Sequence, residues 1–225
     1  MITFEKVTKK FGSIIALEDI SFKVEEGEFA FITGPSGAGK TTVIKLLLRQ
    51  LKPDSGRILI DGKDISAIKS RDIPFYRRRV GVVFQDFKLL PDMTVYENVA
   101  LALQVSGEDK EKASKKTKEA LEQVGLTERS NLFPRQLAGG ELQRVVIARA
   151  LVVNPKIILA DEPTGNLDPA TARQIVSLLA RAADEDTTVL MATHNADIVN
   201  SIKRHVVQLK GGKVAGDKKQ GRYEE

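Results

Sequence analysis

The chain has 225 residues, of which 42% are hydrophobic and 29% charged, so it can bury a core as one large domain or as two lobes. It contains no cysteine, which excludes disulfides and thiolate metal sites. The net charge of +5 permits a nucleotide, a lipid surface or a nucleic acid as partner and selects none of them. Met1–Lys6 has no apolar leader, and no run approaches the roughly 18 apolar residues of a membrane span. We therefore expect any membrane association to go through a partner or the protein surface.

Short strands dominate the first part of the chain. We predict strands at residues 2–8, Leu17–Val24, Phe29–Thr33, Arg57–Ile60 and Lys63–Ile65. The last two flank Asp61-Gly62, a strong hairpin signal. These strands predict an antiparallel β layer beside a nucleotide-binding core.

A glycine-rich turn stands between an apolar strand and a helix that we expect from Lys40 to about Leu51. It fits the pattern G-x-x-x-x-G-K-[ST] with Gly34, Pro35, Ser36, Gly37, Ala38, Gly39, Lys40 and Thr41, and Thr42 comes next. Its glycines let successive N–H groups form an anion nest at the helix N-terminus. We expect Lys40 to reach the β- and γ-phosphates of a nucleotide and the Thr41 hydroxyl to bind Mg²⁺. The alternative, a glycine turn that binds nothing, does not explain why every fixed position and both flanks agree.

The middle of the chain is helical. Ile73–Arg79 is basic and partly helical, and Val80–Phe84 is a buried strand that ends at Gln85. We predict helices at Val95–Gln104, Asp109–Val124 and Glu141–Val153. The chain therefore divides into a core lobe, about 1–85 and 155–225, and a helical lobe, about 86–154, inserted into it.

After Pro155 strands and helices alternate again. We predict strands at Ile157–Ala160 and Thr188–Ala192, helices at Ala170–Ala183 and Ala196–Ile202, a hairpin of Val206–Leu209 with Lys213-Val214, and a mobile tail from Asp217. Continuous apolar strands alternating with helices predict an α/β fold with a mainly parallel sheet covered on both faces.

Two acidic residues follow the strand at 157–160. Asp161 stands where the strand ends, so its carboxylate can reach the Mg²⁺ of the same nucleotide. Glu162 comes next and can polarise the attacking water if it is held near the γ-phosphate. Without the phosphate loop upstream, two ordinary surface acids would explain the pair equally well.

Three single residues are ambiguous. The Gln85 amide could reach both Mg²⁺ and the water, or it could be polar surface. The His194 imidazole could hydrogen-bond the γ-phosphate, or it could be structural. Phe11 could stack on adenine or belong to the core.

A second anion-binding element lies far from the phosphate loop in sequence. Leu137, Ala138, Gly139, Gly140 and Glu141 precede a helix, and two glycines at a helix N-terminus can bind an anion. One chain need not supply both elements to one nucleotide, because a second copy could supply the other.

Taken together, these motifs resemble the nucleotide-binding domain of ABC transporters, in the family's order and over essentially the whole chain. The resemblance implies a RecA-like P-loop NTPase that hydrolyses ATP with Mg²⁺. It assigns Phe11 to adenine stacking, Gly34–Thr41 to Walker A, Gln85 to the Q-loop, 137–141 to the signature motif, Asp161-Glu162 to Walker B and His194 to the switch histidine. It also assigns Asn166-Leu167-Asp168 to the D-loop and implies that Asp168 contacts the nucleotide. It also implies an ATP-dependent head-to-tail homodimer in which each ATP lies between one subunit's Walker A and the other's signature.

Within the family, the segments 83–91 and 94–99 resemble the cell-division branch of the type VII group, whose other members serve lipoprotein release and macrolide or toxin export. That implies an integral membrane partner at the cytoplasmic face of the plasma membrane. Two residues depart from the pattern: Ala138 replaces the signature serine, and Asn195 stands where an Asp often follows the histidine.

The resemblance also suggests that the partner docks a short helix in a groove near Gln85 to Met93. The apolar residues there are Phe84, Phe87, Leu89, Leu90, Pro91 and Met93. Simple packing between the lobes is the alternative for each of them. An ATPase acting on nucleic acid is a weaker hypothesis, supported only by the basic charge, so we expect no nucleic-acid partner. A third hypothesis is a nucleotide-sensing scaffold that does not turn over, and the presence of Glu162 and His194 argues against it.

Overall fold

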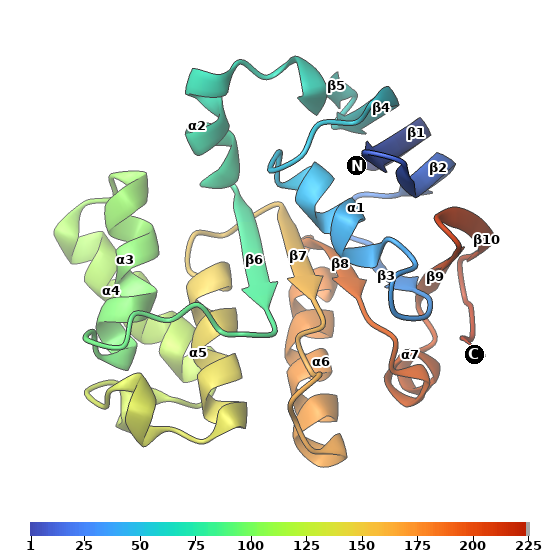
Figure 1. Ribbon diagram of the computed structural model, residues 1–225. Coiled ribbons are helices and arrows are strands. Elements are labelled where there is room, and N and C mark those ends of the chain that lie inside the picture. The colour runs from blue at the N-terminus through green and yellow to red at the C-terminus, as the bar shows by residue number, and fades with distance from the viewer. Residues whose placement is uncertain (224–225) are drawn as a thin grey trace.

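The computed structural model describes residues 1–223 and contains two sheets with helices around them (Figure 1). The strands are β1 (Ile2–Phe11), β2 (Ile14–Val24), β3 (Phe29–Thr33), β4 (Ser55–Ile60), β5 (Lys63–Asp64), β6 (Val80–Phe84), β7 (Ile157–Asp161), β8 (Thr188–Ala192), β9 (His205–Lys210) and β10 (Lys213–Lys218). The α-helices are α1 (Lys40–Leu47), α2 (Ile73–Arg77), α3 (Val95–Ser106), α4 (Lys110–Gln123), α5 (Gly139–Leu151), α6 (Pro169–Asp184) and α7 (Ala196–Ile202). Short 3₁₀ turns lie at Ile65–Ala67, Ser70–Asp72, Thr127–Arg129 and Pro134–Gln136.

The larger sheet has the order β10-β9-β3-β8-β7-β6 and is parallel except for β10. Every residue of β3 and β8 is buried, and these strands are accordingly apolar except for one threonine in each, Thr33 and Thr188. Because the strands are parallel, their carboxyl ends share one edge of the sheet. The phosphate loop, Gln85, Glu162 and His194 all follow strand ends on that edge.

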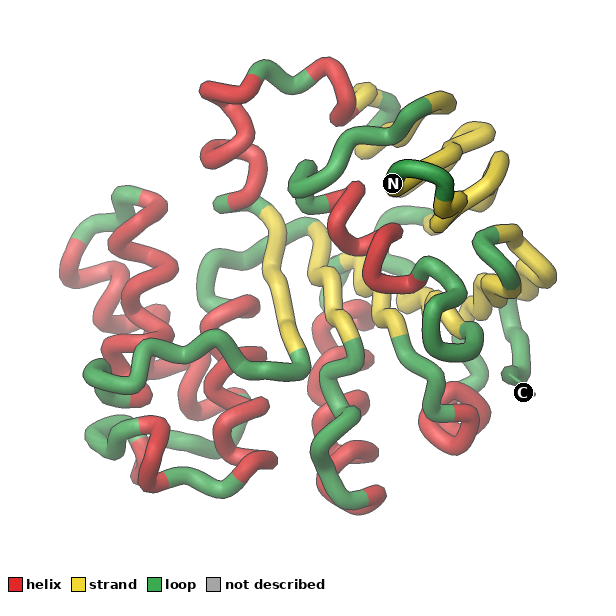
Figure 2. The backbone as a smooth tube through the Cα atoms, viewed as in Figure 1, coloured by secondary structure: helices red, strands yellow, loops and turns green. Residues whose placement is uncertain are grey.

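Both faces of this sheet are covered. One face packs, through Phe31, Val83 and Ile158, against α3, α5 and α6. The other face packs, through Ile32 and Leu159, against α1 and the smaller sheet. The backbone trace shows helices α3–α5 gathered beyond β6 and the antiparallel strands on the far side of α1 (Figure 2). The predicted α/β class, with a mainly parallel sheet, an antiparallel layer and a helical insertion, is confirmed; the division into two lobes stays a prediction.

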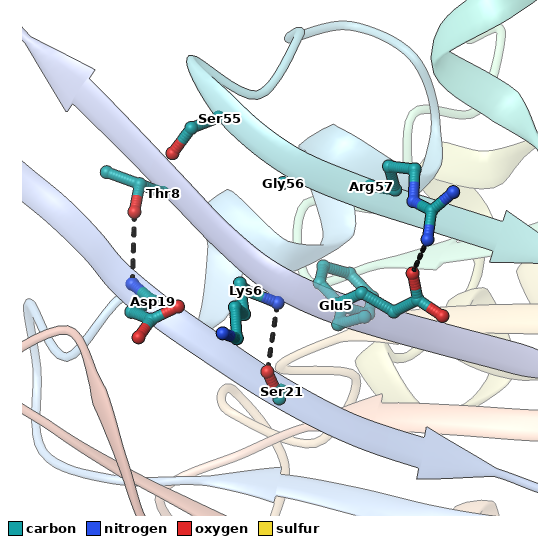
Figure 3. Close-up of a pocket in the computed structure, with 9 residues that line it drawn as sticks. Glu5, Lys6, Thr8, Asp19, Ser21, Ser55, Gly56 and Arg57 are labelled. Atoms are coloured by element: carbon teal, nitrogen blue, oxygen red, sulfur yellow. Dashed lines mark hydrogen bonds and ion pairs between the residues drawn. The ribbon is translucent and has the colours of Figure 1, made fainter.

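The smaller sheet, β2-β1-β4-β5, is antiparallel and irregular. Lys6 and Asp19 take left-handed backbone conformations, with φ of 48° and 50°, where the ladder between β1 and β2 is interrupted. Side chains replace the lost ladder bonds: the Lys6 N–H donates to Ser21 Oγ at 2.9 Å, and the Asp19 N–H donates to Thr8 Oγ1 at 3.0 Å. Figure 3 shows this irregular patch as a shallow hollow on the outer face, beside the Arg57–Glu5 ion pair.

The helices in the middle begin at side-chain caps. Thr94 and Glu97 form a reciprocal capping box at the start of α3, and Gly107 ends that helix with φ 81°. Asp109 caps α4 by accepting from the N–H groups of Glu111 and Lys112. No helix among residues 1–223 is long and apolar enough to cross a bilayer.

The prediction of a mobile tail from Asp217 is wrong for the described residues. Strand β10 continues to Lys218, and the Tyr223 side chain is only 2% exposed. The Tyr223 N–H donates to Asn200 Oδ1 at 2.9 Å, and its carbonyl accepts from Asn200 Nδ2 at 3.0 Å. The charged composition of this segment predicts mobility, but the segment also contains one buried aromatic residue whose backbone is hydrogen-bonded. Residues 224–225 lie outside the described part of the chain.

Candidate functional site

The phosphate loop takes conformations that its glycines alone permit. Gly34 has φ 144°, and a Cβ there would lie 2.2 Å from the carbonyl oxygen of Leu209. Gly39 has φ 105°, and a Cβ there would lie 2.8 Å from the carbonyl oxygen of Ala16. Within residues 1–223 no acceptor is bonded by the N–H groups of Ser36, Gly37, Gly39, Lys40 and Thr41. A run of unpaired donors at a helix N-terminus fits the oxygens of a polyphosphate.

The buried Lys40 side chain crosses this loop. Its Nζ donates to the carbonyl oxygens of Gly34 at 2.8 Å and Pro35 at 3.2 Å. The same Nζ lies 3.5 Å from Glu162 Oε1. The ammonium is therefore held at the mouth of the loop, as the sequence predicts for a phosphate-binding lysine.

Glu162 and His194 meet although 32 residues separate them. Glu162 Oε1 lies 2.8 Å from His194 Nδ1, and the imidazole is 61% exposed on its other side. Glu162 has φ 47°, a left-handed conformation that costs free energy in a non-glycine residue, and its N–H donates to the Ala192 carbonyl at 2.9 Å. Because of this left-handed conformation, the chain at Glu162 leaves the direction of the strand that ends at Asp161.

Asp161 contacts the helix side of the loop. Its Oδ1 accepts from the Thr41 hydroxyl at 3.2 Å. Burial raises the pKa of Asp161 above its usual value, an effect that the Thr41 hydrogen bond partly opposes. A carboxylate and a hydroxyl in contact are the oxygen ligands that Mg²⁺ accepts. Residues 1–223 contain no group of three or more histidine, cysteine, aspartate or glutamate side chains that could hold a metal ion.

Gln85 contacts the loop after β7. Its Nε2 donates to Asn166 Oδ1 at 3.1 Å, and a Cβ at Gly165 would lie 2.8 Å from that nitrogen. Among residues 1–223 no hydrogen bond joins it to Thr41, Asp161 or Glu162. Its predicted roles toward metal and water stay predictions, and the contact with Asn166 has no local signal in the sequence.

Phe11 is not a core residue. It ends β1, its ring is 46% exposed, and Lys9 Nζ lies 5.6 Å from the ring centroid. The β2 strand that follows touches the phosphate loop, since Ala16 and Leu17 lie against Gly39. The core alternative for Phe11 is therefore excluded, and its stacking on adenine stays a prediction.

The segment Leu137–Glu141 forms a separate helix start. Helix α5 begins at Gly139, two residues before the predicted start. Glu141 Oε2 accepts from the Ala138 N–H at 2.9 Å, and Arg129 Nε donates to Glu141 Oε1 at 3.2 Å. The N–H groups of Gly139, Gly140 and Glu141 bond no acceptor within residues 1–223.

No hydrogen bond or ion pair joins this segment to the phosphate loop among the described residues. Asp168, predicted to contact the nucleotide, caps α6 in the single chain: its Oδ1 accepts from the N–H groups of Ala170 and Thr171 at 3.0 Å each. Hydrogen bonds from Thr171 and Ala170 lower the pKa of Asp168.

Comparisons with known proteins agree with this geometry. A family model described as ABC transporter matches residues 17–165. The cell division ATP-binding protein FtsE of Bacillus subtilis (strain 168) is 49% identical over 224 residues, covering 99% of this chain and 98% of the relative. FtsE of Streptococcus pneumoniae (strain ATCC BAA-255 / R6) is 48% identical, covering 99% and 97%.

Among solved structures, the dimeric post-hydrolysis state of the ATP-binding cassette MJ0796, bound to ADP and Pi, has a TM-score of 0.87 and 36% identity, covering 99% of this chain and 100% of that chain. The resemblance seen in the motifs is confirmed. The chain is an ATPase that belongs to the ABC transporter family and, within it, to the group of FtsE cell-division ATP-binding proteins.

Proposed function

We propose that this chain binds and hydrolyses ATP as the ATPase subunit of an FtsEX-type cell-division complex. In this complex, closure of an ATP-bound dimer acts on an FtsX-type membrane partner that activates peptidoglycan hydrolases. The observation that carries the proposal is the meeting of three side chains at the phosphate loop. Glu162 lies 3.5 Å from the Lys40 ammonium and 2.8 Å from His194. A cation, a base and an orienting imidazole at one loop supply what phosphoryl transfer to water requires.

Each side chain then has a defined task. The loop N–H groups and Lys40 bind the β- and γ-phosphates, for which Lys40 exchanges its contacts with the Gly34 and Pro35 carbonyls. Glu162 accepts a proton from the attacking water, and His194 fixes the orientation of that carboxylate. Phe11 offers its exposed ring to adenine.

The metal would be Mg²⁺, with Thr41 and Asp161 as its protein ligands and Gln85 as a third candidate. When bound, it neutralises charge on the phosphate oxygens. Its arrival also removes the penalty of keeping the Asp161 carboxylate buried and ionised.

The chain would work as a head-to-tail homodimer. Among residues 1–223, the N–H groups of Gly139, Gly140 and Glu141 bond no acceptor, and none of them is hydrogen-bonded to the chain's own phosphate loop. A second copy can bring these groups to the γ-phosphate, which makes ATP part of the interface. The dimeric state of the MJ0796 cassette supports this arrangement.

We place the partner at the residues that follow Gln85. Leu90 is 41% exposed there, whereas Phe87 and Leu89 pack against the core. The predicted apolar surface therefore narrows to the exposed Leu90 and Pro91 and the half-buried Met93. Such a partner would hold the ATPase at the cytoplasmic face of the plasma membrane. An ATPase subunit for lipoprotein release or for macrolide or toxin export is the second candidate, because type VII systems share these segments.

The decisive experiment uses Glu162→Gln, with the exposed Glu119→Gln as matched control. We expect ATP hydrolysis to fall by at least about 100-fold, because an amide cannot take the water's proton. Light scattering with Mg²⁺ and ATP should find the Glu162→Gln protein dimeric. Equal hydrolysis rates for Glu162→Gln and wild type would contradict the assignment of the base, and a strictly monomeric variant, even beside membranes, would contradict the dimer.

The partner surface needs its own test. Leu90→Asp should lose capture of the membrane partner from solubilised membranes while its ATP affinity and thermal melt stay at wild-type values; Leu90→Met should retain capture. Unchanged capture by Leu90→Asp would remove this surface from the proposal. Identification of the captured protein distinguishes the division role from lipoprotein release or export.

A further inference from the structure

The C-terminal end of α1 is held by side chains from α2. Tyr76 Oη donates to the Leu47 carbonyl at 2.5 Å, Arg77 Nε to the Leu48 carbonyl at 2.8 Å, and a second Arg77 nitrogen to the Arg49 carbonyl at 3.0 Å. The last carbonyls of a helix have no partner within it. Leu47 is the last residue of α1, Leu48 is its C-cap and Arg49 follows, so α2 satisfies three consecutive carbonyls at and just beyond the end of the helix. We call these three bonds the α1 clamp.

The opposite end of α1 is the phosphate loop. The helix has only eight residues, so roughly 12 Å separates the clamp from Lys40 and Thr41. Val43, Ile44, Leu46 and Leu47 are fully buried between the two sheets, which makes α1 a rigid unit. The guanidinium of Arg77 at its C-terminal end also complements the helix dipole, whose positive end faces the phosphates.

The other face of α2 is exposed. Phe75 is 60% exposed, and the Arg78 guanidinium lies 5.0 Å from its ring centroid. Both line a groove of about 860 Å³ between α2, the β4–β5 hairpin and the end of α3. Figure 1 shows α2 above β6, the strand that leads to Gln85, with α1 beside it. Helix α2 therefore contacts the end of α1 with Tyr76 and Arg77, and Tyr76 also lines the groove beside Phe75 and Arg78.

We propose that Tyr76 and Arg77 are positioning residues for nucleotide binding. The clamp fixes α1 and so keeps the phosphate loop in its binding geometry before the nucleotide arrives. Without the clamp, the C-terminal end of α1 frays, and a smaller fraction of the molecules holds the phosphate loop in its binding geometry. The apparent affinity for nucleotide falls in proportion to that fraction. This inference rests on the proposed nucleotide role of Lys40 and Thr41.

Arg77→Gln tests the clamp, and Arg78→Gln is its matched control. The control residue is the next arginine in the chain, and it bonds to no backbone carbonyl among residues 1–223. Titration of the full chain with a fluorescent ATP analogue and Mg²⁺ should show about 3- to 10-fold weaker binding for Arg77→Gln and less than about twofold change for the control. Arg77→Lys, which can restore one bond, should fall between them.

Two readouts separate positioning from general stability. For Arg77→Gln the KM for ATP should rise while kcat changes by less than about twofold, since Glu162 and His194 are not on α1. Hydrogen exchange should speed up in α1 and not in α5. If Arg77→Gln does not fold, Tyr76→Phe removes one clamp bond and keeps the ring, and its affinity should fall by about 2- to 5-fold.

Affinities of Arg77→Gln and Tyr76→Phe equal to that of Arg78→Gln would overturn the proposal. Lys40→Ala distinguishes this failure from failure of the function itself. If Lys40→Ala loses the nucleotide while both clamp variants bind normally, only the clamp is wrong. If Lys40→Ala also binds normally, the phosphate site was misassigned and the clamp fails with it.

Discussion

The phosphate loop and the segment Leu137–Glu141 both present free N–H groups at a helix N-terminus, but their surroundings differ. Lys40, Asp161 and Glu162 converge on the first. The second has Glu141 turned back onto its own backbone and paired with Arg129. One element thus carries charge and a base, whereas the other carries only oriented dipoles. The difference teaches that, in the dimer proposed above, each chain would supply two unlike half-sites: the phosphate loop with the groups for chemistry, and Leu137–Glu141 with N–H groups for the nucleotide of the other copy.

Lys40→Ala removes the charge of the first half-site and should have the largest effect. A charge-assisted hydrogen bond contributes about 1.5–3 kcal/mol, so nucleotide affinity should fall by about 10- to 100-fold. Isothermal titration with ATP and Mg²⁺ measures it. Retained affinity would mean that the loop dipoles suffice and that the two half-sites are more alike than we infer.

Gly139→Ala breaks the second half-site without disturbing the chain. A Cβ there would lie 3.6 Å from Leu167 Cδ2, an ordinary contact, whereas one at Gly140 would lie 2.5 Å from Thr171 Cγ2. We expect a thermal melt within about 2 °C of wild type and at least about tenfold slower hydrolysis, because the methyl group would meet the partner's nucleotide. Hydrolysis is measured by phosphate release.

Mixing the two variants sharpens this test. A mixed dimer of Lys40→Ala with Gly139→Ala has one intact composite site. An equal mixture should recover up to about a quarter of the wild-type rate if the sites act independently. No recovery, with mixed dimers shown to form, would argue against half-sites shared between copies.

Ala138→Ser should improve the second half-site by a smaller amount. The added hydroxyl can donate to the partner's γ-phosphate, and about 0.5–1.5 kcal/mol corresponds to roughly 2- to 10-fold tighter ATP-dependent dimerisation. Serine is also a better N-cap than alanine, so the nucleotide-free chain should melt slightly higher. A higher melting temperature without tighter dimers, by analytical ultracentrifugation of hydrolysis-blocked protein, would limit the hydroxyl to capping.

Asp161→Asn should change stability least, and in the favourable direction. Because burial raises the pKa of Asp161, its folded-state proton is held more tightly than in the unfolded chain. The free-energy cost of keeping this carboxylate buried and ionised is absent below the ordinary pKa of an aspartate. It grows as the pH rises from that pKa to the raised pKa of the folded state. The nucleotide-free variant should therefore melt about 1–3 °C higher at pH 7, with the difference vanishing near pH 3. A variant that melts lower would show that the carboxylate is structural.

Structural features that depend on residues contiguous in the sequence could be predicted. The phosphate loop lies between a strand and a helix, and Asp161 ends a strand, so local pattern and backbone geometry agree. The order β3-β8-β7 then brings Lys40 to Glu162, across 122 residues, as parallel pairing requires.

Features that depend on one distant contact could not be predicted. Tyr223 packs in the main hydrophobic cluster and its backbone bonds Asn200, and nothing near Asp217 in the sequence signals either contact. Two further contacts join segments that are distant in sequence: Arg77 bonds Leu48 and Arg49, and Gln85 bonds Asn166. The distance in space between such segments depends on how the intervening chain folds, so no local pattern predicts these bonds. For the apolar residues after Gln85, the sequence left packing between the lobes and partner binding equally open. Their exposure in the structure distinguishes the packed residues from the exposed ones.

The left-handed backbone at Glu162 has a consequence for laboratory evolution. Glycine and asparagine adopt φ near 47° more easily than glutamate, by about 1 kcal/mol. A screen that rewards heat resistance alone would therefore favour those residues at this position. The selected variants would be more heat-resistant but unable to hydrolyse ATP, so such a screen must also select for ATP hydrolysis.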